Sequence, residues 1–372
     1  MLKKPLVAGT YTEKDIVTTQ TRAVNTAVTE SMNGELLFSL MTNLDTTRRY
    51  NSFYYHMILH AIIGLMGNED IIKWSNLYNV SSAEKAALLL TRLDPRELRV
   101  LSGIELGMSQ YEFVPTNVLT KYSGLSAEEA KFWLGELDKK DLLYGQAGSY
   151  SGYILNYNGY DLLALNAIVK SDMLQALGKP VGMGKEADVF EAMTPRKEKV
   201  AVKFHRLGRV SFRDTRRKRG FIGERRHMSW LYQSRLAAER EYEALKKAYE
   251  AGVSVPRPIF QNRHVVVMEF IEGHQLSEVS ELDDPEAFLD EILINVKKAY
   301  DAGLIHNDLS EFNLMASGEG KIYIIDWPQY ISRGDPNAQT VLKKDVANVL
   351  RFFSRKFRVS KHIDDVTAFL FQ

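Results

Sequence analysis

Three oxygen-bearing side chains stand at a spacing typical of phosphoryl transfer. Asp308 lies in the segment Ile305–Leu314, Asn313 follows five positions later, and Asp326 comes thirteen positions after Asn313. Phosphoryl transfer requires a positioned acceptor and a divalent metal that neutralises phosphate charge. The spacing therefore predicts a kinase-like catalytic loop. Asp308 would orient or deprotonate the acceptor, and Asn313 and Asp326 would hold Mg²⁺, with Mn²⁺ as an alternative.

An apolar strand upstream carries a lysine. Lys203 stands within Val200–Phe204, and a lysine in the middle of a buried strand is costly unless it is paired or bound to a ligand. In kinases this lysine holds the α- and β-phosphates of ATP and pairs with a glutamate on the next helix. Glu241 is the preferred partner over Glu239, because Glu241 flanks the apolar stripe of that helix.

Two further segments complete a nucleotide site in the expected order. Gly182, Gly184 and Lys185 form a glycine-rich turn whose N–H groups could approach phosphates, although a plain hairpin turn is an equal reading. The apolar strand around Met268 suits the hinge that borders an adenine pocket. Met268 would lie behind the base, and Glu269 and Ile271 would contribute backbone groups.

The segment after Asp326 departs from ordinary protein kinases. Trp327-Pro328-Gln329 stands where Phe-Gly is usual, no Ala-Pro-Glu follows, and 46 residues remain. An ordinary kinase holds an extended peptide with an activation segment and several helices in this region. A kinase that acts on extended peptides in trans is therefore disfavoured.

Composition and the pattern of polar and apolar residues along the chain predict an α+β protein of three regions. We expect an N-terminal helical extension of unknown role over residues 1–82, a winged helix-turn-helix over 83–167, and a truncated bilobal kinase-like domain over 172–372. The net charge is +1, and the absence of cysteine excludes disulfides and thiol catalysis. Neither a signal peptide nor a membrane span is expected, which fits a cytoplasmic protein.

The second region has the order helix, helix, helix, hairpin. Helical periodicity runs through 86–90 and 96–108, and a short helix is expected over 116–122. Ser126 and Glu129 form a capping box at the start of a further helix that ends near Asp141, and 153–157 alternates as a strand. The Ser126 helix carries five acids and three lysines. A net negative helix is poorly suited to the DNA major groove, so this domain is better interpreted as an interaction platform or as one that contacts the edge of an RNA.

A basic insert separates Lys203 from the Glu241 helix. Between Arg206 and Arg226 there are nine Arg or Lys and two acids, with aromatic residues interspersed. Phosphate neutralisation together with stacking fits RNA, and a solvated loop is the simpler alternative. The candidates for RNA contact are Arg213, Arg216, Arg217, Lys218 and Arg219.

Together these motifs resemble the RIO kinases, specifically their second branch, over about residues 83–372. The resemblance rests on the glycine-rich turn, the segment 202–205, the basic insert, the catalytic loop, Ile325–Gln329 and the winged module. It implies binding of ATP and Mg²⁺ and contact with the maturing small ribosomal subunit, both its RNA and its proteins. It also implies that Asp326 can itself accept phosphate. Ala187 stands where the family has serine, which removes a hydroxyl contact to phosphate.

Two other functions remain open from the sequence. Small-molecule kinases of the aminoglycoside or choline type share the Ile-Asp-Trp ending and a similar catalytic loop, although they usually lack a winged module and a basic insert. A DNA-binding regulator whose kinase-like lobe senses nucleotide would use the winged helix, but the acidic Ser126 helix opposes it. The oligomeric state does not follow from these patterns.

Overall fold

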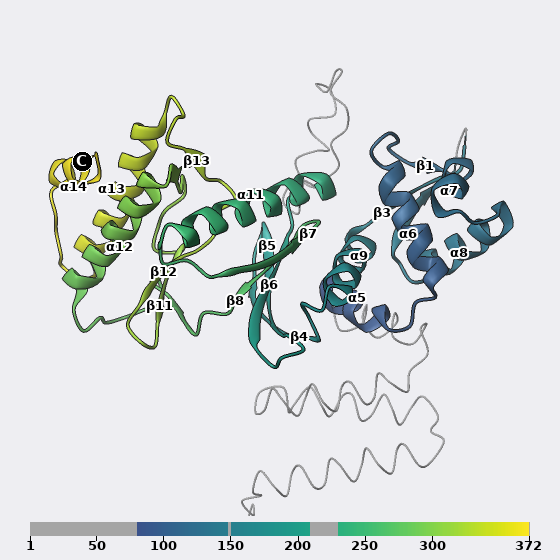
Figure 1. The fold of residues 1–372 in the computed structure, drawn as a ribbon, viewed down its shortest axis with the longest axis horizontal. Coiled ribbons are helices and arrows are strands. Elements are labelled where there is room, and N and C mark those ends of the chain that lie inside the picture. Colours follow the sequence, from purple (N-terminus) through teal and green to yellow (C-terminus); the bar gives the residue numbers. More distant parts are fainter. Residues whose placement is uncertain (1–79, 148–149, 209–229, 372) are drawn as a thin grey trace, which may run out of the picture. The chain divides into compact units, whose positions relative to one another are not determined.

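The computed structural model describes residues 80–147, 150–208 and 230–371, and Ser81–Gln372 forms one compact unit. All but the last three residues of the predicted helical extension lie outside the described residues, as do the RNA-contact candidates at 213–219. Along the chain, a helical module comes first, a five-stranded sheet follows, and a mainly helical lobe completes the unit (Figure 1). The α+β prediction is confirmed.

The N-terminal module consists of helices around a small antiparallel sheet in the order β1-β3-β2. Its elements are α5 (Ser82–Leu90), α6 (Pro95–Gly107), β1 (Val114–Pro115), α7 (Thr116–Ser123), α8 (Ala127–Lys139), β2 (Leu143–Gln146), β3 (Gly152–Leu155) and α9 (Tyr157–Lys170). Helices α5, α6 and α8 each begin with a capping box, which satisfies N–H groups that a helix leaves unpaired at its start. The predicted box of Ser126 and Glu129 is one of them.

Helix α9 was not predicted, and the strand expected over 153–157 is too long. Strand β3 ends at Leu155 because Asn156 caps the following helix, with its Oδ1 accepting the N–H of Gly159 at 3.1 Å. Gly159 also lets α9 approach the main chain closely. A Cβ atom at this position would lie 2.1 Å from the carbonyl oxygen of Leu142.

A five-stranded antiparallel sheet in the order β4-β5-β6-β8-β7 forms the first kinase-like lobe. Its strands are β4 (Ala176–Met183), β5 (Ala187–Met193), β6 (Lys199–His205), β7 (Pro258–Asn262) and β8 (Val265–Glu269). Strand β6 is buried from Val200 to His205, so both of its faces are covered and Lys203 lies inside the protein. Helix α11 (Trp230–Glu250) packs against β6, β7 and β8 (Figure 1).

The second lobe combines three helices with short strands. These elements are β9 (Gly273–Gln275), α12 (Pro285–Asp301), β10 (Leu304–Ile305), β11 (Leu314–Ser317), β12 (Ile322–Ile324), β13 (Ile331–Ser332), α13 (Ala338–Lys356) and α14 (Ile363–Phe371). Strands β11 and β12 pair antiparallel, with Leu314 opposite Ile324. Since Asn313 directly precedes β11 and Asp326 follows two residues after β12, the hairpin brings both side chains to the same end.

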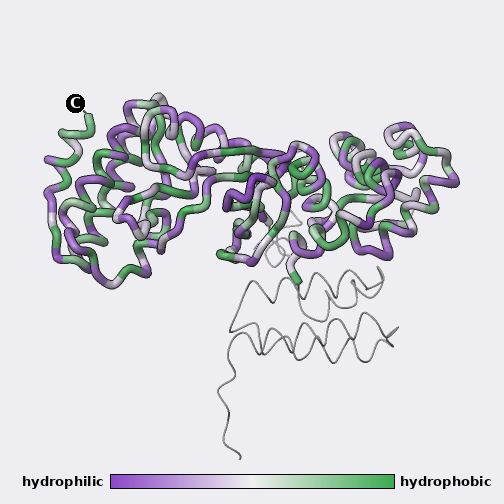
Figure 2. The backbone as a smooth tube through the Cα atoms, turned by 60° about the horizontal axis from the view of Figure 1, so that its bottom comes forward, coloured by the Kyte–Doolittle hydropathy of each residue, from purple (hydrophilic) through white to green (hydrophobic). Residues whose placement is uncertain are grey.

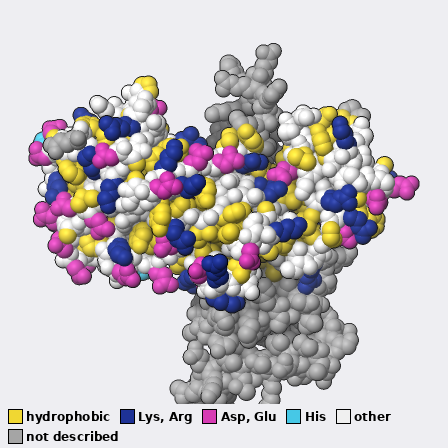
Figure 3. All heavy atoms as spheres, viewed as in Figure 1, with side chains coloured by type: hydrophobic (Ala, Val, Ile, Leu, Met, Phe, Trp, Pro, Cys, Tyr) yellow, Lys and Arg dark blue, Asp and Glu magenta, His cyan; other side chains and the backbone are white. Residues whose placement is uncertain are grey.

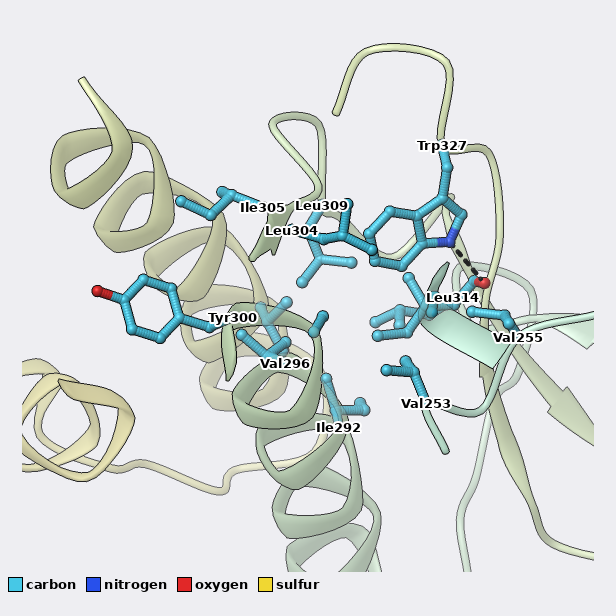
Figure 4. Close-up of a cluster of buried hydrophobic side chains, with 14 of the residues drawn as sticks. Val253, Val255, Ile292, Val296, Tyr300, Leu304, Ile305, Leu309, Leu314 and Trp327 are labelled. Carbon is cyan, nitrogen blue, oxygen red and sulfur yellow. Dashed lines mark hydrogen bonds between the residues drawn. The ribbon is translucent and has the colours of Figure 1, made fainter. Parts of the chain in front are cut away.

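Trp327 belongs to the core of this lobe (Figure 4). Its indole packs among buried apolar side chains that include Leu309 and Leu314, and its Nε1 donates to the carbonyl oxygen of Ile324 at 3.1 Å. The residue that replaces the usual phenylalanine after Asp326 is therefore a core residue. It ties the turn that carries Asp326 to the strand before it.

Polar and apolar residues are mixed along the helices of the described chain (Figure 2), as is typical of helices that bury one face and expose the other. Among the described residues, every helix is too short or too polar to cross a bilayer. On the face drawn in Figure 3, acidic and basic side chains lie interspersed over the described part of the surface.

Candidate active site

Lys203 lies between two carboxylates. Its Nζ is 2.6 Å from Oε1 of Glu241 on α11 and 2.6 Å from Oδ1 of Asp326. Burial alone lowers the pKa of a lysine, but here the charges of Glu241 and Asp326 outweigh burial and raise the pKa of Lys203. The side chain therefore stays a fixed cation at neutral pH, in position to bind anionic phosphate oxygens.

Glu241 is held by three donors rather than by Lys203 alone. Its Oε2 lies 2.7 Å from Nε2 of His205, and its Oε1 also accepts the backbone N–H of Trp327 at 3.3 Å. Burial raises the pKa of a carboxyl group, yet Lys203 and His205 bring the pKa of Glu241 down to about 2. Helix α11, strand β6 and the Asp326 turn therefore converge on one ionised carboxylate.

The catalytic loop presents Asp308 to solvent. The amide of Asn313 donates to the main-chain oxygen of Asp308 at 2.8 Å and lies 3.4 Å from its Oδ2. Asn307 adopts a φ of 69°, and asparagine tolerates this left-handed conformation better than most residues. The exposed carboxylate of Asp308 can thus reach an acceptor that arrives from outside.

Asp345 on α13 binds the main chain of the loop that carries Asp308. This residue was not identified from the sequence patterns. Its carboxylate accepts the N–H groups of Asn307 at 2.7 Å and Leu309 at 3.2 Å, one on each side of Asp308. Burial raises the pKa of Asp345 to about 6, against the effect of these two hydrogen bonds. The one feature of the sequence that could have identified Asp345 is its place as an acidic residue on the apolar face of an amphipathic helix.

The turn that carries Asp326 is built from strained backbone and a buried histidine. Asp326 has a φ of 68°, a left-handed conformation that residues other than glycine rarely adopt. The N–H of Ile325 donates to the carbonyl oxygen of Asn313 at 3.0 Å, and Nε2 of His306 lies 2.9 Å from the carbonyl oxygen of Ile325. Burial lowers the pKa of His306, so a neutral ring donates this bond at pH 7.

The donor set fits a hard cation that arrives with a nucleotide. The Asn313 amide nitrogen is used within the loop, which leaves its oxygen as the metal-binding atom, and the Asp326 side chain is 43% exposed. Two oxygen-bearing side chains cannot complete an octahedral Mg²⁺ shell, so phosphate oxygens and water would supply the other ligands. No cluster of three or more His, Asp or Glu side chains suited to a metal occurs in the described ranges.

The glycine-rich turn joins β4 to β5. The N–H of Gly184 donates to the carbonyl oxygen of Ala187 at 2.8 Å, and Gly182 and Lys185 are exposed. Val189, just after the turn, lies opposite Lys203 in the β5–β6 ladder. The turn therefore leads directly into β5, the strand next to the one that carries Lys203.

The proposed hinge lies at the end of β8. Met268 is buried opposite Ala201 of β6, and Ile271 lies two residues beyond the strand. The N–H of Glu269 donates to the carbonyl oxygen of Arg257 at 2.9 Å. This N–H is therefore used within the protein, and a base would have to pair with other main-chain groups of the hinge.

One residue counted in the basic insert has a different role. Arg206 is fully buried and forms ion pairs with Asp161 and Asp188, so it is not part of a solvated RNA-contact surface. Because Arg206 borders an arginine-rich segment, nothing in the sequence indicated that this arginine is buried and paired with two carboxylates. The rest of the insert, residues 209–226, lies outside the described residues.

Comparison with known proteins places these features in a family. The family model described as RIO domain matches residues 188–366, and the model described as Rio2, N-terminal matches residues 90–171. The RIO-type serine/threonine-protein kinase Rio2 of Methanocaldococcus jannaschii is 38% identical over 264 residues, covering 70% of this chain and 96% of that protein. The chain belongs to the RIO family of serine/threonine kinases. The family resemblance predicted from the motifs is confirmed, in the Rio2 branch.

Other Rio2 relatives agree with this placement. The serine/threonine-protein kinase rio2 of Dictyostelium discoideum is 36% identical over 274 residues, covering 72% of this chain and 52% of that protein, so the chain spans about half of its length. The crystal structure of the Rio2 kinase of Chaetomium thermophilum in an ADP/Mg²⁺-phosphoaspartate complex is 32% identical, with a TM-score of 0.66. That match covers 75% of this chain and 87% of the crystallised chain.

Proposed function

We propose that this protein transfers the γ-phosphate of ATP in the presence of Mg²⁺ and acts in maturation of the small ribosomal subunit. The observation that carries the enzymatic part is the position of Lys203, which bridges Glu241 on α11 and Asp326. The exposed Asp308 and the amide of Asn313 lie on the loop next to that turn. This set provides a phosphate-binding cation, two metal ligands and an acceptor-orienting carboxylate.

Each residue then has a distinct task. Lys203 binds the α- and β-phosphates, and Glu241 keeps the ammonium in place. Asn313 and Asp326 hold Mg²⁺, which neutralises the charge of the phosphates when it is bound. Asp308 orients the attacking oxygen and accepts its proton if that oxygen belongs to a hydroxyl group or water.

Asp326 is itself a candidate acceptor. The Rio2 kinase of Chaetomium thermophilum was crystallised as a phosphoaspartate complex, and the Asp326 side chain of this chain is partly exposed beside Lys203. In such a transfer, a carboxylate oxygen of Asp326 forms a bond to the γ-phosphorus, and the bond to the β-phosphate oxygen breaks to release ADP. Water then hydrolyses the acyl phosphate, so that the net reaction is ATP hydrolysis.

The proposed partner is a pre-small-subunit particle in the cytoplasm. The arginine-rich segment 206–226 provides positive charge for ribosomal RNA, beyond the structural Arg206. Replacing Arg216, Arg217, Lys218 and Arg219 together by alanine should reduce co-sedimentation of the protein with such particles. The same variant should keep its ATPase activity, because Lys203, Asp308, Asn313 and Asp326 are unchanged.

The test of the enzymatic proposal is Asp308→Ala, measured as phosphate release and as ADP binding. We expect turnover to fall by at least about 100-fold, while Mg²⁺-dependent nucleotide binding persists, because Asp308 is assigned no contact with the nucleotide. Glu319→Gln is the matched control, since Glu319 is an exposed acid elsewhere in the same lobe. Normal turnover by Asp308→Ala would contradict the proposal, and robust phosphorylation of a small alcohol would favour a small-molecule kinase.

A further inference from the structure

Arg206 lies at the centre of a buried ionic cluster that takes no direct part in the chemistry above. Its Nη1 and Nη2 donate to the two carboxylate oxygens of Asp161 on α9 at 2.6 and 2.7 Å, and its Nε donates to Asp188 on β5 at 2.9 Å. All three side chains are fully buried. His264 on the β7–β8 turn adds its Nε2, 2.7 Å from Oδ1 of Asp161.

Such a cluster is stable only with its geometry intact. Charges removed from water are costly unless each is paired and hydrogen-bonded, and here one guanidinium serves two carboxylates. The rings of Tyr157 and Phe204 each lie 5.0 Å from the guanidinium carbon. Arg206 is therefore fixed in one orientation, and any element bound to it shares that orientation.

One of those elements is the end of the glycine-rich turn. The backbone N–H of Arg206 donates to the carbonyl oxygen of Glu186 at 2.6 Å, and its side chain binds Asp188 two residues later. Ala187, between them, lies opposite His205 in the ladder and accepts the N–H of Gly184. Arg206 thus holds the turn where it enters β5, through both main chain and side chain.

The opposite side of the cluster belongs to the N-terminal module. Asp161 lies on α9, within the residues matched by the Rio2 N-terminal model. The same helix contacts α11, because the hydroxyl group of Tyr157 lies 3.0 Å from that of Ser234 and donates to the carbonyl oxygen of Leu207 at 2.7 Å. Helix α9 therefore contacts α11, which carries Glu241, and it reaches the end of the glycine-rich turn through Arg206.

We propose that Asp161 is a positioning residue for nucleotide binding: through Arg206 and Asp188 it fixes the glycine-rich turn, so the N-terminal module is part of the nucleotide-binding machinery. The inference rests on the proposed function of the Lys203 site. A glycine-rich turn is flexible, and ordering it costs conformational entropy that nucleotide binding must otherwise offset. The Arg206 cluster already orders the turn before nucleotide binds. We therefore expect it to affect the affinity for nucleotide rather than the rate of the chemical step.

The variant Asp161→Asn in the full chain tests this, because it keeps the shape of the side chain and removes its charge. We expect the Kd for Mg²⁺·ADP, measured by titration calorimetry, and the KM for ATP to rise about fivefold or more, with kcat at saturating ATP within about twofold of wild type. A general loss of folding would instead lower the active fraction and leave KM unchanged.

Glu105→Gln is the matched control. Glu105 lies on α6 of the same module and binds Arg263 with both oxygens, at 2.8 and 2.6 Å, so it too joins the module to the β7–β8 turn. Its partner has no contact with the glycine-rich turn among the hydrogen bonds of the described residues. We expect Glu105→Gln to lower the Tm but to leave the Kd for Mg²⁺·ADP unchanged.

Hydrogen–deuterium exchange on the wild-type protein covers the case in which Asp161→Asn does not fold. Because coupling is reciprocal, saturating Mg²⁺·ADP should slow amide exchange in α9 (Tyr157–Lys170), while α8 (Ala127–Lys139) stays unchanged. An unchanged Kd in a folded Asp161→Asn variant, or unchanged exchange in α9, overturns the inference alone. Failure of the wild-type protein to bind Mg²⁺·ADP overturns the proposed function with it.

Discussion

Lys203 and Asp326 lie 123 positions apart in the chain, and their charged atoms are 2.6 Å apart. The same ammonium group binds Glu241 at an equal distance. The ammonium group of Lys203 therefore connects helix α11, through Glu241, to the turn in which Asp326 would hold the metal. A nucleotide phosphate that binds Lys203 would compete for this cation with Asp326, the more exposed of the two carboxylates.

Glu241→Gln should separate Lys203 from α11. The variant removes the buried charge that holds the ammonium, so we expect kcat/KM for ATP to fall on the order of 100-fold. Unfolding free energy should fall by about 3 kcal/mol, as is usual when one partner of a buried pair is removed. Steady-state kinetics and urea denaturation measure both effects. Glu243→Gln, an exposed site on the same helix, should change neither, and equal effects at both positions would refute this role of Glu241.

His205→Ala should loosen Glu241 without touching Lys203. The loss leaves Oε2 of Glu241 without its 2.7 Å partner in a buried site, which costs about 1–3 kcal/mol of stability. We expect kcat/KM to fall on the order of tenfold, as is typical of a residue that acts through another. His205→Gln retains a donor and should restore part of the activity. Failure of glutamine to improve on alanine would argue that only the volume of the ring matters.

Asp345 should make stability fall as pH rises between about 4 and 6.5. Its pKa in the folded protein is about 6, above the ordinary value of 3.8, so the folded state binds a proton that the unfolded state releases. The stabilisation is fully present below pH 3.8 and is lost as pH rises through 6, by up to about 3 kcal/mol. Asp345→Asn does not titrate. Its stability relative to wild type, measured by urea denaturation across this range, should therefore increase with pH, and a constant difference would contradict the assignment.

Two glycines in the N-terminal module should respond in opposite directions to alanine. A Cβ at Gly135 in α8 meets no atom within 4 Å, so Gly135→Ala should raise stability by about 0.5–1 kcal/mol by reducing the entropy of the unfolded chain. A Cβ at Gly159 in α9 would lie 2.1 Å from the main-chain oxygen of Leu142, so Gly159→Ala should destabilise by at least about 1 kcal/mol. Thermal unfolding of both variants gives the comparison, and a stable Gly159→Ala protein would show that α9 can shift.

Much of the site could be predicted because its signals are local. Lys203 is recognisable because a charged residue interrupts a buried strand, and Glu241 because helical periodicity places it beside an apolar stripe. Asp308, Asn313 and Asp326 are recognisable from spacing, since a loop and a two-strand hairpin of fixed length connect them. The capping box at Ser126 is likewise a signal contained within four residues.

The remaining features depend on contacts between distant segments. The start of α9 was missed because Asn156 serves as an N-cap and Gly159 as a close-packing residue, and both types are also typical of turns. Arg206 resembles its arginine-rich neighbours, and Asp345 resembles any acid on an amphipathic helix.

Residue type and spacing were enough to identify the residues that could do chemistry, their order along the chain and the family to which they belong. The packing of the chain, in contrast, determined that Arg206 and Asp345 are buried and which groups they contact. Arg206 becomes an anchor rather than a surface cation because Asp161 and Asp188, 45 and 18 positions away, enclose it where water is excluded. The burial of Arg206 follows from contacts between distant segments, and its arginine-rich neighbourhood in the sequence does not indicate it.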